Sequence, residues 1–122
     1  MLDRIDLEHI LFLDIETVPA YGNFNALDDE MKELWAQKTQ YQRKDEFTPE
    51  AFYERAGIWA EFGKIICISV GYFSFKGEDR TFRTTTFHGD ENKLLKEFKN
   101  LLITQFSQAK HLLCGHNGKE FD

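Results

Sequence analysis

The chain has 122 residues, of which 42% are apolar and 15% aromatic, and its formal net charge is −6. That length allows one domain at most, and the apolar content predicts a packed core and excludes a disordered chain. The charge excludes the broad basic surface with which many proteins hold duplex nucleic acid. It does not exclude a nucleic-acid enzyme whose bound cations supply the positive charge locally.

The sequence also bears on the cellular compartment. No apolar run approaches the roughly eighteen residues of a membrane span, and residues 1–6 lack the features of a signal peptide. Cys67 and Cys114 lie in apolar, strand-like runs without metal-ligand spacing. We expect both to be buried free thiols, which predicts a reducing cytoplasmic location and no membrane partner.

The first predicted elements are a strand and a helical insertion. Residues 9–14 read as a strand, because residues 10–13 form a short unbroken apolar run. Pro, Asn and Gly within residues 18–25 end it. A helix is predicted over residues 27–44, and Thr48 caps a second one that runs to about residue 59. The insertion therefore covers about residues 26–60.

A hairpin, a helix and a strand follow. Residues 64–75 and 80–87 are rich in β-branched and aromatic side chains, and about four turn residues join them. Asp90 is predicted to cap the next helix, which has one apolar stripe. The stripe consists of Leu94, Leu95, Phe98, Leu101, Leu102 and Phe106. The apolar residues 111–114 predict a last short strand, which Gly115 ends.

Acidic residues mark two places in this order of elements. Asp14 and Glu16 end the first strand, where an i, i+2 spacing puts both on one face and they would repel unless a cation lay between them. An equally weighted alternative is that the end of the strand frays into solvent and Glu16 is simply exposed. Asn117 and Asp122, taken alone, are an ordinary helix cap and a partner of the helix dipole.

Taken together, these segments resemble a known family. Residues 11–17 (LFLDIET) resemble the first motif of the DEDD superfamily of 3′–5′ exonucleases, and residues 113–122 (LCGHNGKEFD) resemble the second. The chain is most similar to bacterial exonucleases that resemble the proofreading domain of family-B DNA polymerases. Their first motif often continues into Val-Pro, as at Val18 and Pro19, and residues 61–71 also resemble this group.

The resemblance implies a fold. It is an α/β ribonuclease H-like mixed sheet with flanking helices, in which three antiparallel strands precede parallel strands joined by helices. Residues 9–14, 64–75, 80–87 and 111–115 would be its first four strands. The first helix of the fold would be residues 91–106.

The resemblance also implies a chemistry. Two divalent cations, Mg²⁺ or Mn²⁺, would lie about 4 Å apart, one helping to generate the attacking hydroxide and the other stabilising the leaving 3′ oxygen. Hard cations prefer oxygen ligands, which agrees with a motif made of acids. Asp14 would bridge both ions, Glu16 would bind the ion that carries the water, and Asp122 the other ion. Asn117 would support the site or contact the terminal nucleotide of the substrate, and Thr17 would hydrogen-bond the 3′ end through its backbone or its hydroxyl.

The family has a third motif, a final Asp with Tyr or His four residues before it, and the printed chain ends before such a motif. We therefore expect residues 1–122 to be the N-terminal portion of a single exonuclease domain, truncated before the fifth strand and inactive or nearly so. The expected partner is the 3′ end of single-stranded DNA, with RNA as the other option. Residues 111–115 would be an exposed strand edge that supports self-association.

Two other functions remain open from the sequence. One is a non-catalytic module on the same fold that binds nucleic acid or protein. The other is a ribonuclease H-like enzyme of another type, such as an endonuclease.

Overall fold

The structure, a computed structural model, describes residues 5–116. The described chain divides into two compact units, one formed by residues 17–64 and the other by the segments before and after them. No helix within residues 5–116 has both the length and the apolar character that crossing a membrane requires.

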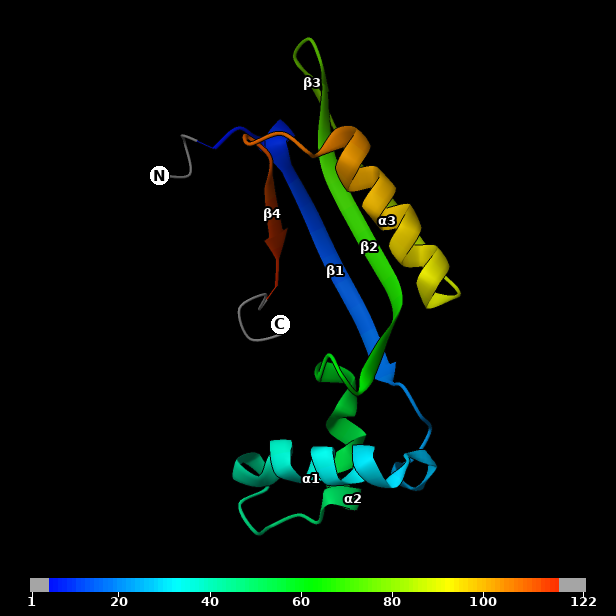
Figure 1. The fold of residues 1–122 in the computed structure, drawn as a ribbon. Helices are drawn as coiled ribbons and strands as arrows, with labels where there is room; N and C mark the ends of the chain where they lie inside the picture. Colours follow the sequence, from blue (N-terminus) through cyan, green and yellow to red (C-terminus); the bar gives the residue numbers. More distant parts are fainter. Residues whose placement is uncertain (1–4, 117–122) are drawn as a thin grey trace. The chain divides into compact units, whose positions relative to one another are not determined.

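A four-stranded sheet has the strand order β3–β2–β1–β4. β1 (Ile10–Pro19) pairs in parallel with β4 (Leu112–Gly115), and β2 (Gly63–Lys76) is antiparallel to β3 (Asp79–His88). Helix α3 (Glu91–Gln105) connects β3 to β4 and lies along one side of the sheet (Figure 1). The architecture is therefore α/β with a mixed sheet and flanking helices, as the sequence predicts.

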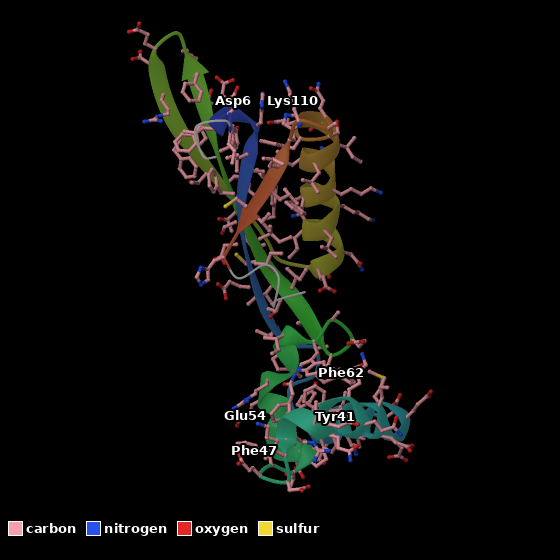
Figure 2. All side chains as sticks on the ribbon, turned by 90° about the vertical axis from the view of Figure 1, so that its left-hand side faces the viewer. Asp6, Tyr41, Phe47, Glu54, Phe62 and Lys110 are labelled. Atoms are coloured by element: carbon pink, nitrogen blue, oxygen red, sulfur yellow. The ribbon has the colours of Figure 1, made fainter. Side chains whose placement is uncertain are left out.

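The two faces of the sheet differ because side chains alternate along each strand. One face packs against α3 around four buried residues, which are Leu11, Ile68, Val70 and Leu94. Leu13 and Ile15 of β1 also pack against this core. The opposite face is here called the open face, and it carries Phe12, Asp14 and Glu16. Figure 2 shows α3 along one side of the sheet and other side chains projecting from the far side.

Helix α3 begins as its sequence predicts. The Asp90 side chain accepts a hydrogen bond from the Lys93 amide at 3.3 Å, which satisfies a backbone donor of the first turn. Oε2 of Glu91 accepts a hydrogen bond from the Ile65 amide at 2.6 Å and so ties the start of the helix to β2. The apolar stripe packs on the sheet except for Leu95, which is 38% exposed.

Two predicted boundaries in the sheet were wrong. β1 continues to Pro19 instead of ending near residue 14, because the β-branched Thr17 and Val18 suit a strand. The strand ends at Pro19, which lacks an N–H for further pairing. The hairpin turn has two residues between the strand ends, Gly77 and Glu78, not about four. Gly77 has φ of 64°, which glycine adopts without a steric penalty and which tight hairpin turns require.

The unit of residues 17–64 contains a 3-10 turn, η3 (Phe24–Ala26), and the helices α1 (Asp29–Arg43) and α2 (Pro49–Phe52). The side chain of Asp28 caps α1, and that of Thr48 caps α2 as predicted.

The second helix is shorter than predicted. After one α-helical turn the chain tightens into the 3-10 helix η4 (Tyr53–Ile58). This tighter turn eclipses side chains three residues apart, so that Tyr53 and Ala56 are buried together.

The core of this unit surrounds Trp35, whose side chain is fully buried. Its indole Nε1 donates a hydrogen bond to the Pro49 carbonyl at 2.8 Å, which satisfies the buried donor. The aromatic rings of Phe52, Tyr53 and Phe62 lie 5.9, 5.5 and 4.9 Å from the Trp35 ring between centroids. Aromatic packing therefore gives these residues a hydrophobic core of their own.

Candidate functional site

Asp14 and Glu16 share the open face of β1. They are two residues apart on one strand, which directs both side chains to the same side, and both are exposed. Within residues 5–116 neither carboxylate forms an ion pair with a basic side chain. Two neighbouring carboxylates in this position repel each other, and a cation between them would relieve that repulsion.

The strand register brings the second motif to the first. β4 is parallel to β1, and Leu13 lies opposite Gly115 in the ladder. Parallel strands end at the same edge of a sheet, so the chain leaves β4 beside Asp14. The two segments that resemble exonuclease motifs are about a hundred residues apart in sequence, and the ladder makes their described parts neighbours.

The rest of the predicted ligand set is not placed. Asn117 and Asp122 lie outside the described residues, so the predicted third carboxylate and the predicted substrate contact stay predictions. Among residues 5–116, no group of three or more His, Cys, Asp or Glu side chains is arranged to hold a metal ion. Asp14 and Glu16 are therefore the predicted ligands whose positions are known.

Thr17, a predicted substrate contact, is half-buried at the next position of β1. Alternation directs its side chain away from the face that carries Asp14 and Glu16. Its Oγ1 would lie 3.3 Å from a Cβ added at Gly57, so the hydroxyl is packed against the 3-10 helix η4. Its role in substrate binding stays a prediction, and a contact to a substrate on the open face would have to come from its backbone.

A hollow next to Asp14 was missed by the sequence reasoning. It has a volume of about 230 Å³ and lies on the open face, between β1 and the β2–β3 hairpin. Phe12, Phe82, Ser69 and Thr84 line it together with Asp14. The alternation of β1 already puts Phe12 beside Asp14, but the cross-strand neighbours depend on the hairpin register, which no motif reveals.

The cysteines are free, as predicted, but their predicted burial was wrong. Cys114 is exposed and Cys67 is half-buried. Cys114 lies on β4, the outer strand of the described sheet, opposite Phe12 in the ladder, so its side chain belongs to the open face, which α3 does not cover.

No family model matches the chain, and comparisons with curated proteins and with solved structures give no match. A function for the chain is therefore inferred from the motifs and from the arrangement of the described residues.

Proposed function

We propose that this chain is part of a metal-dependent 3′–5′ exonuclease domain of the DEDD superfamily, with a ribonuclease H-like fold, which removes nucleotides from the 3′ end of DNA. The observation that carries the proposal is the parallel β1–β4 pairing with Leu13 opposite Gly115. This register joins the described parts of two motifs that resemble the same active site. The exposed free thiol of Cys114 also supports a reducing, cytoplasmic location.

The donor set suits the proposed cofactor. Asp14 and Glu16 offer oxygen ligands on one exposed face, and hard divalent cations such as Mg²⁺ and Mn²⁺ take oxygen ligands. Two such ions, when bound, would neutralise the scissile phosphate and lower the pKa of a water for attack on it. Asp14, Glu16 and Asp122 would hold them.

The protein residues would act mainly by positioning. Asp14 lies on β1, an inner strand of the described sheet, one residue past the end of the ladder with β4. A carboxylate on a rigid strand holds its ligand geometry better than one on a loop. Thr17 and Asn117 would orient the terminal nucleotide of the substrate, and a single DNA strand would approach over the open face.

Binding of Mn²⁺ to the chain tests this proposal. We expect isothermal titration calorimetry to detect binding, and both Asp14→Asn and Glu16→Gln to weaken it by at least about tenfold, since each removes a charged ligand. Asp29→Asn is the control, because Asp29 is an exposed acid of α1 and its substitution changes the net charge equally. Equal Mn²⁺ binding by all four proteins would refute the metal site and favour a non-catalytic binding module.

A further inference from the structure

Three phenylalanines form a group on the open face beside Asp14. Phe12 of β1, Phe73 of β2 and Phe82 of β3 contact one another, with ring centroids 6.0 Å apart for Phe12 with either partner and 4.9 Å apart for Phe73 and Phe82. We call these three residues the phenylalanine platform. Phe82 remains 47% exposed, so it presents a large part of its ring to solvent.

A glycine makes room for the exposed ring. Phe82 lies over Gly71 of β2, where an added Cβ would come within 2.3 Å of the ring atom Cζ. Any side chain at position 71 would therefore displace the ring. Gly71 is buried beneath the ring, and because it has no side chain the ring can lie close to the backbone of β2. Two residues of the platform, Phe12 and Phe82, line the hollow that Asp14 also lines.

The hollow combines aromatic rings with polar groups, and a nucleobase can stack on the first and hydrogen-bond to the second. Phe12 and Phe82 offer ring surfaces for stacking, and Ser69 and Thr84 line the same hollow. The Ser69 hydroxyl also shares a hydrogen bond of 3.0 Å with Thr86 Oγ1. Every base has a π-face, so aromatic stacking holds single strands with little dependence on sequence. Hydroxyl groups can donate and accept, and so they tolerate different base edges.

Charge favours a strand of nucleic acid over an apolar protein segment. The Arg80 guanidinium lies 5.5 Å from the centre of the Phe73 ring, which puts a cation at the platform. The proposed metal ions at Asp14 would provide positive charge on the other side. Positive charge on both sides of a bound base would attract the phosphates that flank each nucleotide in a strand.

We propose that the phenylalanine platform is a base-stacking subsite for single-stranded nucleic acid, in which Phe82 packs against a base near the nucleotide held at Asp14. This inference rests on the proposed function, which gives the strand a reason to pass Asp14. The stacking itself requires no metal, so the two ideas can fail separately.

The test compares two fluorescein-labelled thymidine oligonucleotides, one intact and one with abasic sites near its 3′ end, by fluorescence anisotropy with Ca²⁺ present. We expect the wild-type chain to bind the intact strand about tenfold more tightly than the abasic strand. Phe82→Leu should remove this preference, and Phe82→Tyr should keep it. Phe47→Leu is the matched control, because Phe47 is 41% exposed and lies in the other unit.

The outcomes separate the two proposals. Equal binding of both oligonucleotides by the wild type overturns the stacking subsite, and this comparison needs no variant to fold. A base preference that Phe82→Leu retains, in a variant with an unchanged circular dichroism spectrum, also overturns it. If the base preference is seen but Asp14→Asn does not alter Mn²⁺ binding, the stacking subsite stands and the nuclease proposal fails.

Discussion

At the scale of single residues, Arg43 connects the end of α1 to the loop that follows. Its Nε donates to Thr39 Oγ1 at 3.0 Å, and its two terminal nitrogens donate to the carbonyls of Ala36 at 2.8 Å and Phe47 at 3.2 Å. The Thr39 hydroxyl is itself buried and donates to the Trp35 carbonyl at 2.7 Å. The guanidinium therefore donates to three acceptors, and the hydrogen bonds to Thr39 and Ala36 are partly buried.

Replacing Arg43 by alanine should lower the free energy of unfolding by about 1–3 kcal/mol, because partly buried acceptors lose a charged donor. Urea unfolding followed by tryptophan fluorescence measures the change, since Trp35 and Trp59 both lie in this unit. Gln42→Ala is the control at the neighbouring exposed position of the same helix. Equal midpoints of urea unfolding for the two variants would show that these hydrogen bonds make no net contribution to stability.

At the scale of elements, Lys38 of α1 forms an ion pair with Glu61, two residues before β2. The hydrogen bond from the Lys38 ammonium is the main reason that the pKa of Glu61 lies below its ordinary value of 4.5. A lowered pKa in the folded state means that the unfolded state binds the proton more readily. The stabilisation is therefore present above pH 4.5 and is lost as pH falls through the lowered pKa.

The substitution Glu61→Gln should reduce stability at neutral pH by less than about 1 kcal/mol, because both side chains are well exposed to solvent and screened. The difference from the wild type should shrink on acidification below pH 4.5 and also at high salt. Thermal unfolding over a pH series measures it, with Glu46→Gln, an exposed loop acid, as the control. A difference that stays constant with pH would contradict the role assigned to the pair.

The elements themselves were largely predictable from the sequence. Strands, helices and the caps at Thr48 and Asp90 follow from local signals, which are alternation, the apolar stripe and side chains that bond the first turn. The end of β1 was missed because β-branched residues outweigh the nearby proline. Cys114 was predicted to be buried because its neighbours in sequence are apolar, although the family resemblance already put residues 111–115 at an exposed edge of the sheet, where β4 lies.

The shared face of Asp14 and Glu16 was predictable from the sequence, and the surroundings of Asp14 were less so. Asp14 and Glu16 share a face because of their spacing alone, and the structure places them so. The position of the Phe82 ring over Gly71 depends on the register of the hairpin. That register depends on the two-residue turn, which was predicted to have about four residues. Local sequence patterns therefore do not predict which side chains meet across neighbouring strands.

At the scale of the whole molecule, the two edges of the described sheet differ in character. The β3 edge carries Asp79, Arg80 and Arg83, and charges on an edge strand oppose pairing with another chain. β4 has the sequence LLCG without a charge, and Leu112 and Leu113 are 48% and 62% exposed. An uncharged apolar edge offers unpaired backbone groups to a second strand. We therefore propose that two copies of the chain associate through β4.

Leu113→Lys tests this association, because a lysine on the edge strand opposes pairing by its charge and its solvation. We expect the sedimentation coefficient of the wild type to rise with protein concentration and that of Leu113→Lys to stay at the monomer value. Leu95→Lys is the control, since it introduces the same charge at an exposed leucine of α3. A wild type that is monomeric at every concentration would refute the association, and a Leu113→Lys variant that still associates would move the interface away from β4.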